Sequence, residues 1–231
     1  LLASLSTTMV LQFHYNFGAY PDILCYFFLL LAFINKERPV SPYIFFFIAL
    51  LTKETAIFTA LFFLALKNFS KMKLLLSCVL YLPIYLSLNT GSYNLEHYLT
   101  PLQSDLMYWI NQSKPFIVTG YFSSIKYLWI VVILYIFRDF RNSYPVILLI
   151  LGISLQFMLG GDTTRFVSFI FLGLIFVVEK LKLDKFLFLN IFILFLNIVT
   201  AKYYVFAYGE MIILNESRLS FLNFFEIFNE N

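Results

Sequence analysis

The stretch SPYIFFFIALLTKETAIFTALFFLAL, residues 41–66, decides how the whole chain is interpreted. It consists of two apolar runs, 41–51 and 56–66, separated by Thr52-Lys53-Glu54-Thr55. Two structures suit this pattern: one helix that crosses a membrane with charges at its middle, or two half-length helices that fold back as a hairpin. The two alternatives give opposite orientations to every later segment, so the choice between them fixes the predicted topology.

The composition of the chain predicts a lipid environment. Apolar residues make up 61% and charged residues 13% of the 231 residues, whereas soluble domains are usually about 45–50% apolar. A water-soluble domain of this size cannot bury so much apolar surface. The composition therefore argues against a soluble globular enzyme, a disordered chain and a nucleic-acid-binding protein. The net charge of +3 is too small to indicate a charged partner.

Long apolar stretches without a two-residue alternation predict an all-α polytopic bundle of roughly eight to nine membrane segments, with a short helical hairpin around Lys53-Glu54. The stretches are 1–16, 23–34, 42–51, 56–66, 74–88, 116–137, 144–159, 166–178 and 186–206. We expect a transmembrane helix bundle over 1–206 and an interfacial helical tail over 207–231, on the non-cytoplasmic side. Because the chain opens within an apolar stretch, we expect it to be a fragment that lacks upstream membrane segments.

The distribution of Lys and Arg favours the hairpin, because cytoplasmic loops of membrane proteins are enriched in these residues. With a hairpin, ten of the sixteen basic residues fall in cytoplasmic loops and four outside; with a single span, six fall inside and eight outside. The hairpin places its charged turn at mid-depth, which requires a water-filled cavity open to the outer side. We therefore expect the site to face outward, and the short basic cytoplasmic loops to carry no chemistry.

Lys53 and Glu54 are the strongest candidate site residues. Charged side chains deep in an apolar segment cost roughly 2.5–3.5 kcal/mol each on insertion scales, and they usually serve a function. Lys53 would bind an anion, most simply a phosphate, and Glu54 would act as a metal ligand, as a partner for a hydroxyl group or as a base. The alternative is an ion pair that neutralises itself and merely supports the turn.

Other polar residues on the expected outer side are weaker candidates. Asp22 opens an apolar helix, as either a charge that stabilises the helix N-terminus or a carboxylate at the rim of the cavity. Asp162 and Arg165 either form an ion pair that closes the turn Gly160–Arg165, or supply an acid and an anion-binding guanidinium. His14 is either an interfacial histidine or a contact to the substrate.

These residues lie in motifs that resemble the polytopic GT-C glycosyltransferases, relatives of the mannosyl- and aminoarabinosyltransferases that use polyprenyl-phosphate sugars. The motifs are AYPDILCYFFLLLAF (19–33), IALLTKETAIFTALFFLAL (48–66) and GGDTTRFVSFIFLGLIF (160–176). The resemblance covers residues 15–66 and, more loosely, 144–180. It implies a membrane enzyme that transfers a sugar from a polyprenyl-phosphate carrier to a glycan, lipid or protein acceptor on the non-cytoplasmic face, with the bilayer as a further partner and no nucleic acid.

The resemblance also assigns roles to residues. Lys53 resembles the family's lysine near the carrier phosphate, and Asp162 and Arg165 match a family tendency toward an acid and an arginine at a late outer turn. We expect Glu54 and Asp162 to be catalytic, and Lys53, Arg165, Asp22 and His14 to bind the donor. The family's base usually lies in the first outer loop, which this sequence does not show, so we expect it upstream of Leu1.

The expected chemistry needs a base for the acceptor hydroxyl and positive charge for the departing phosphate. Lys53 and Arg165 would supply that charge, or a divalent cation (Mg²⁺ or Mn²⁺) would supply it, bound by Glu54 and Asp162. No cofactor is certain from the sequence. Two other classes remain: a transporter or flippase with a broken-helix substrate site, and a non-catalytic membrane subunit, in which replacing Lys53 or Arg165 affects assembly but not sugar transfer.

Overall fold

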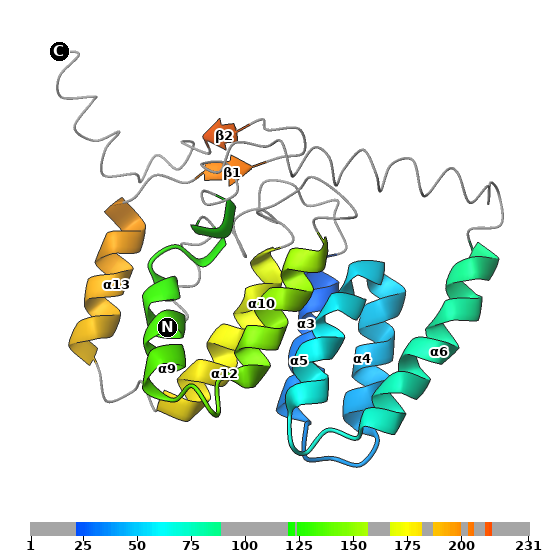
Figure 1. The fold of residues 1–231 in the computed structure, drawn as a ribbon. Helices are drawn as coiled ribbons and strands as arrows, with labels where there is room; N and C mark the ends of the chain where they lie inside the picture. The colour runs from blue at the N-terminus through cyan, green and yellow to red at the C-terminus, as the bar shows by residue number, and fades with distance from the viewer. Residues whose placement is uncertain are drawn as a thin grey trace.

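The computed structural model describes residues 22–88, 120–122, 124–156, 167–181, 187–199, 203–205 and 211–213. Helices that lie side by side form most of this structure (Figure 1). The α-helices are α3 (Asp22–Ile34), α4 (Ser41–Thr52), α5 (Ala60–Ala65), α6 (Lys71–Leu88), α9 (Leu128–Arg138), α10 (Tyr144–Leu155), α12 (Phe171–Leu181) and α13 (Leu187–Val199). Two 3₁₀ helices, η1 (Glu54–Thr59) and η3 (Ser168–Ile170), precede α5 and α12.

The helices start and stop where the sequence changes from polar to apolar. Pro42 and Pro145 occupy the first turns of α4 and α10, positions that lack an intrahelical partner for their missing N–H. The loop before α4 and the loop before α10 are held by backbone hydrogen bonds, among them Arg38 N–H to Asn35 O at 2.8 Å and Val146 N–H to Ser143 O at 2.9 Å. Short polar loops therefore connect consecutive helices.

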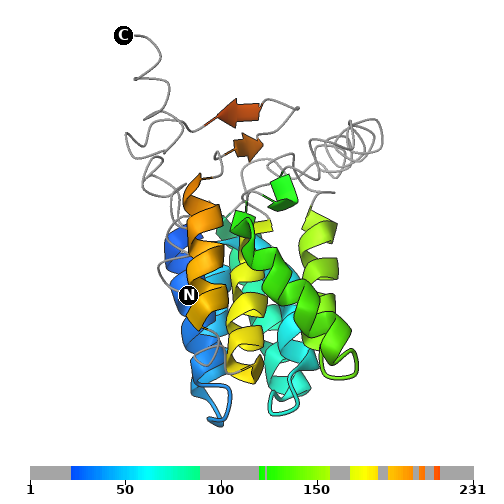
Figure 2. The same cartoon turned by 90° about the vertical axis from the view of Figure 1, so that its left-hand side faces the viewer.

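Aromatic side chains form the centre of the bundle. The ring of Phe62 lies 5.8 Å from Phe33 and 6.0 Å from Phe176, which joins α5 to α3 and α12. Tyr26 meets Phe169 edge to face, with centroids 5.0 Å apart. Figure 2 shows that α12 runs through the middle of the bundle, and it contacts α3, α9 and α10. These ring pairs add specific geometry to the burial of large apolar side chains.

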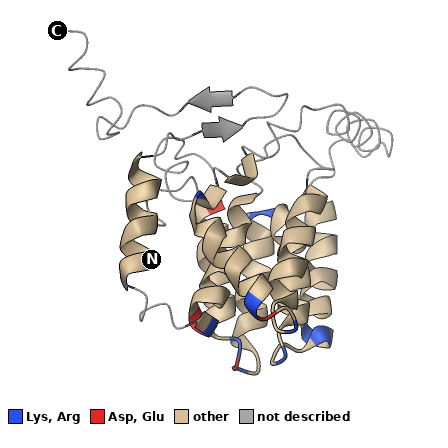
Figure 3. Cartoon of the chain, turned by 60° about the vertical axis from the view of Figure 1, so that its left-hand side comes forward, with Lys and Arg blue, Asp and Glu red and all other residues tan. Residues whose placement is uncertain are grey.

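The chain reverses direction at Lys53. The two ends of the stretch 41–66 meet at one end of the bundle, where the Tyr43 hydroxyl accepts a hydrogen bond from Ser70 N–H at 2.6 Å and Asn68 donates to Glu37 at 2.6 and 2.7 Å. We call this the Lys36 end, and the opposite end, where α4 stops, the Lys53 end. Figure 3 shows that charged residues gather at the ends of the bundle, while the sides of the helices are largely uncharged.

Among the described helices, none is both long and apolar enough to cross a bilayer. Six of them have 11 to 13 residues, or about 16–20 Å at 1.5 Å per residue, against a hydrocarbon core of about 30 Å. Helix α6 has 18 residues, but it starts with two lysines and contains Pro83. The prediction of a polytopic bundle of eight to nine membrane segments is therefore wrong, as is the predicted integral-membrane location with a site facing the non-cytoplasmic side.

Two predicted apolar segments are interrupted, and a short strand pair occupies part of the predicted helical tail, although the described residues are otherwise helical, as predicted. Within 116–137, Lys126 has a positive φ of 47°. Its ammonium is buried and therefore needs an acceptor, which is the carbonyl of Asn197 at 2.9 Å. Within 186–206, α13 ends and strand β1 (Tyr203–Val205) follows. It pairs antiparallel with β2 (Met211–Ile213), inside the tail predicted as a helix; the rest of 207–231 lies outside the described residues.

Candidate functional site

Lys53 lies at the junction of α4 and η1. Its backbone is extended, with φ −157° and ψ 117°, while its N–H still donates to the carbonyl of Ala49 at 2.9 Å. The hydroxyl of Thr52 donates to the same carbonyl at 2.7 Å, a local bond that competes with continuation of the helix. Because successive side chains of an extended backbone point in opposite directions, Lys53 and Glu54 leave the junction on different sides.

Asp22 approaches Lys53 from the neighbouring helix. It is the first residue of α3, and its fully buried side chain places Oδ1 3.9 Å from Nζ of Lys53. This distance exceeds that of an N–H···O hydrogen bond, about 2.7–3.2 Å, so the contact is Coulombic. The side chain of Lys53 is 15% exposed, and its ammonium can still donate hydrogen bonds to a ligand.

Cys25 lies one turn after Asp22 and shows how closely the polar groups gather. Burial raises the pKa of the Cys25 thiol far above its usual value, the nearby carboxylate of Asp22 raises it further, and a hydrogen bond with Thr52 acts in the opposite direction. The charges of Lys53 and Glu54 also reach this thiol. Cys25 therefore remains protonated and packs as a small apolar residue, surrounded by the candidate site.

An apolar groove begins at Glu54. Its volume is about 410 Å³, and it runs between η1 and α6. The carboxylate of Glu54 lies near Tyr81. The pKa of the Tyr81 hydroxyl is raised to about 12, mainly by burial, then by the charge of Glu54 and, least, by Tyr85. The walls of this Glu54 groove are formed by Glu54, Thr55, Ile57 and Phe58 from η1, and Cys78, Val79, Tyr81, Leu82 and Tyr85 from α6.

Two buried polar side chains lie on the η1 and α10 segments without a hydrogen-bond partner among the described residues. Both amide atoms of Gln156, which is fully buried, and the hydroxyl of Thr55 are in this state. Gly152, one turn before Gln156, packs directly against the carbonyl of Phe58. Because α10 and η1 run in opposite directions there, Gln156 lies at the level of Thr55, near the Lys53 end. The sequence does not single out Gln156, because a single glutamine after an apolar run carries no distinct signal.

Replacing Gln156 with Leu is expected to stabilise the protein. An amide buried without hydrogen bonds costs about 1–3 kcal/mol in proteins, and Leu has a similar volume without polar atoms. We expect the free energy of unfolding, measured by chemical denaturation, to rise by about 1–2 kcal/mol. Ser154→Ala is the matched control on the same helix: its hydroxyl bonds to Tyr121 and Ile150, so its removal should lower stability by about 1 kcal/mol. A less stable Gln156→Leu variant would contradict this account.

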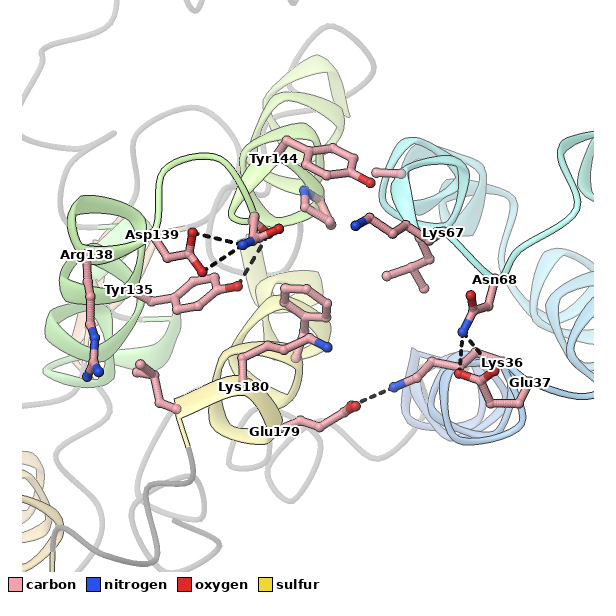
Figure 4. A pocket seen from close by; sticks show the side chains of 16 residues that line it. Lys36, Glu37, Lys67, Asn68, Tyr135, Arg138, Asp139, Tyr144, Glu179 and Lys180 are labelled. Atoms are coloured by element: carbon pink, nitrogen blue, oxygen red, sulfur yellow. Dashed lines mark hydrogen bonds and ion pairs between the residues drawn. The ribbon is translucent and has the colours of Figure 1, made fainter.

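The Lys36 end carries a polar pocket of about 500 Å³ that was not predicted from the sequence (Figure 4). Its walls come from four loops and helix ends that the sequence places far apart: 36–37, 65–68, 135–145 and 176–181. The basic loops expected to carry no chemistry meet here. In the sequence, these loops could have been connected only through the predicted hairpin topology, which brings all of them to the same end of the bundle.

The remaining predicted site residues fall outside the described residues: His14, Asp162 and Arg165. The described residues bring together Asp22, Lys53 and Glu54 of the six predicted site residues. Within the described parts of the chain, no three His, Cys, Asp or Glu side chains form a group that could hold a metal ion. Of the two ligands proposed for Mg²⁺ or Mn²⁺, Glu54 lies in the described part of the chain and Asp162 lies outside it.

Comparison of this chain with protein-family models, curated proteins and solved structures gave no match.

Proposed function

We propose that this chain transfers a sugar from a polyprenyl-phosphate carrier to the hydroxyl group of an acceptor. The observation that supports the proposal is that Glu54 lines an apolar groove while its chain neighbour Lys53 lies 3.9 Å from the carboxylate of Asp22. A polyprenyl phosphate has the complementary form, because it is a long apolar chain that ends in an anionic group. The groove would accept the first isoprene units and the charged cluster would accept the phosphate.

Lys53 binds the phosphate in this proposal. Its ammonium is a compact charge with three donors, and its side chain is mostly buried, where a charge interacts more strongly than in water. Asp22 is a positioning residue, since its buried carboxylate 3.9 Å away holds the ammonium at the end of α4. Arg165 and His14 remain expected contacts to the donor, on residues outside the described part of the chain.

The reaction is a displacement at the anomeric carbon. The oxygen of the acceptor hydroxyl forms a bond to that carbon, the bond from the carbon to the phosphate oxygen breaks, and its electron pair leaves with the polyprenyl phosphate. Lys53 stabilises the charge that develops on the departing phosphate. Glu54 accepts the proton of the acceptor hydroxyl, a step that contributes about 10²–10⁴-fold in enzymes of this kind. Asp162 is the other candidate base.

A lipid surface as partner follows from the same proposal. One face of α6 exposes large apolar side chains: Met72 at 75%, Leu75 at 56%, Leu76 at 55%, Leu80 at 52% and Leu86 at 47%. Exposed apolar patches of this extent mark sites of interaction with lipid or protein. We propose that this face contacts acyl chains of the lipid that presents the carrier, beside the groove in which the carrier binds.

Alkylation of Cys78 tests whether the carrier occupies the groove. Cys78 lines the groove and is half-buried, whereas Cys25, the other thiol of the chain, is fully buried. Burial raises the pKa of the Cys78 thiol, so less of it is thiolate at neutral pH and the reaction with a maleimide should accelerate as the pH rises. In a Cys25→Ala background at alkaline pH, we expect polyprenyl phosphate to slow the alkylation of Cys78 about tenfold.

The controls separate the phosphate from the apolar chain. Polyprenol without phosphate, at the same concentration, should protect much less, and Lys53→Ala should remove the difference between the two lipids. Met72→Cys in a chain without the two native thiols serves as a matched position, because it lies on α6 outside the groove; its alkylation should not respond to the phosphate. Equal protection by both lipids, or none by either, would overturn the proposal.

A further inference from the structure

The polar pocket at the Lys36 end of the bundle, the Lys36 pocket, lies away from the proposed transfer site. Helix α4, with 12 residues, separates the two ends of the bundle by about 18 Å at 1.5 Å per residue. The pocket is lined mainly by charged and amide side chains, unlike the Glu54 groove. A ligand in this pocket would therefore differ in chemistry from a polyprenyl chain.

The three acidic side chains of the pocket already have partners. Glu179 accepts a hydrogen bond from Nζ of Lys36 at 2.6 Å, in an ion pair between the loop after α3 and the end of α12. Glu37 accepts two hydrogen bonds from Asn68 at 2.6 and 2.7 Å. Asp139 likewise accepts two from Asn142 at 3.0 and 2.9 Å. These carboxylates are oriented by neighbours in the wall. Lys36 neutralises the charge of Glu179, whereas Glu37 and Asp139, held by neutral amides, keep their negative charges.

The other ammonium groups of the pocket are differently placed. Figure 4 shows Lys67 and Lys180 directed into the space between the walls, from the loop after α5 and from the end of α12. Neither makes a hydrogen bond or ion pair with another described residue; Lys180 lies 5.5 Å over the ring of Phe176. The hydroxyl of Tyr144 points toward the same space (Figure 4). Two ammonium groups and a hydroxyl group therefore face the cavity, which Arg138 also lines, while each carboxylate is held in place by another side chain.

We propose that the Lys36 pocket binds the phosphate group of a phosphomonoester. A phosphomonoester carries nearly two negative charges at neutral pH, which match the ammonium groups of Lys67 and Lys180, and its oxygens can accept hydrogen bonds from both groups and from Tyr144. A volume of about 500 Å³ falls within the usual range for small-molecule sites, about 300–1,000 Å³, and exceeds what the phosphate alone would fill. The ligand is therefore an organic phosphate, either a free small molecule or a lipid headgroup.

Binding measurements on the full chain distinguish the two sources. The soluble probe is ribose 5-phosphate, titrated calorimetrically, and the lipid probe is a vesicle of phosphatidylcholine with phosphatidic acid, compared with phosphatidylcholine alone. Binding of ribose 5-phosphate supports a free ligand, and binding of the phosphatidic acid vesicles alone supports a lipid headgroup. We expect Lys67→Gln with Lys180→Gln to weaken the binding of the preferred probe at least about tenfold, a loss of about 1.4 kcal/mol.

Arg38→Gln with Lys71→Gln is the matched control, because it removes the same charge from the same end of the bundle at residues that do not line the pocket. This variant should bind the preferred probe as the wild-type chain does. An equal loss in both double variants would show non-specific attraction by the basic end, and would overturn the proposal, as would the absence of binding to either probe. Circular dichroism of each variant confirms that the helices are intact. None of these results depends on the transfer reaction at Lys53.

Discussion

Lys53→Ala is expected to reduce sugar transfer from a polyprenyl-phosphate sugar by about 10²–10³-fold, the range found when a preorganised group that stabilises developing charge is removed. The loss should appear mainly in the rate of transfer, because the ammonium acts on charge that grows as the phosphate departs. The measurement is the release of polyprenyl phosphate from its mannosyl derivative, with a membrane lipid extract as acceptor, followed by mass spectrometry.

Two substitutions make the result specific. Lys53→Arg keeps the charge but spreads it over a planar fork, so it should retain part of the activity. Lys71→Ala removes a lysine from the Lys36 end of the bundle and should leave transfer unchanged. Transfer by Lys53→Ala at the wild-type rate would remove Lys53 from the mechanism. If Lys53→Ala loses its helical structure together with its activity, as judged by circular dichroism, Lys53 has a structural role. That is the result expected if Lys53 and Glu54 form an ion pair that only supports the turn.

The sequence predicted much of the local structure around this site. Apolar runs broken by Thr52-Lys53-Glu54-Thr55 indicated the reversal of the chain, and α4 does end at Thr52. The predicted stretches 23–34, 42–51 and 74–88 agree closely with α3, α4 and α6. Such boundaries can be predicted because they depend on local properties: helix-breaking polar groups, proline in the first turn, and the length of an apolar run.

The environment of the helices could not be predicted from the same evidence. Composition suggested membrane segments because it averages over the whole chain, but most of the apolar runs are individually shorter than a membrane span, and charged or polar residues end them. The run 116–137 shows the same limit, since its length suggested a span. The structure instead places the ammonium of Lys126 in a buried contact with Asn197, more than seventy positions along the chain. A contact between distant segments leaves no periodic signal in the sequence.

The pairing of Asp22 with Lys53 could be predicted only in part. Both were expected on the same side, and the structure places their charged atoms 3.9 Å apart. The Lys36 pocket was not expected, because its lining residues come from loops that appeared to be ordinary polar connections. What distinguishes Lys67 and Lys180 from other surface lysines is that the neighbouring carboxylates already have other partners. That distinction exists in the folded protein alone.

Gly152→Ala is expected to destabilise the protein strongly. A Cβ at position 152 would lie 2.1 Å from the carbonyl oxygen of Phe58, and a backbone oxygen cannot rotate away as a side chain can. Helix α10 and η1 must therefore separate, which disturbs the packing between them. We expect a loss of about 3 kcal/mol in the free energy of unfolding, the upper part of the usual range for overpacked cores, although Ala favours a helix by about 1 kcal/mol over Gly.

Gly173→Ala is the matched control, because it makes the same substitution in α12. Its Cβ would lie 3.1 Å from Cδ2 of Leu149, the end of a side chain that can adjust. The gain in helix propensity is similar at both positions, so the difference between the two variants measures the contact with Phe58. Chemical denaturation should show Gly173→Ala within about 1 kcal/mol of the wild-type chain. Equal stability of the two variants would show that the contact of α10 with η1 does not constrain the fold.

The same substitution also connects the fold to the site. Phe58 and Glu54 belong to one 3₁₀ helix, so a shift of η1 away from α10 moves the residue at the mouth of the groove as well. Polyprenyl phosphate should therefore protect Cys78 from alkylation less well in Gly152→Ala than in Gly173→Ala, under conditions where both variants remain folded. Equal protection in both would mean that the displacement is absorbed by α10 alone. In that case the position of Glu54 depends on α6 and on the end of α4, and the close packing at Gly152 contributes to stability without positioning the site.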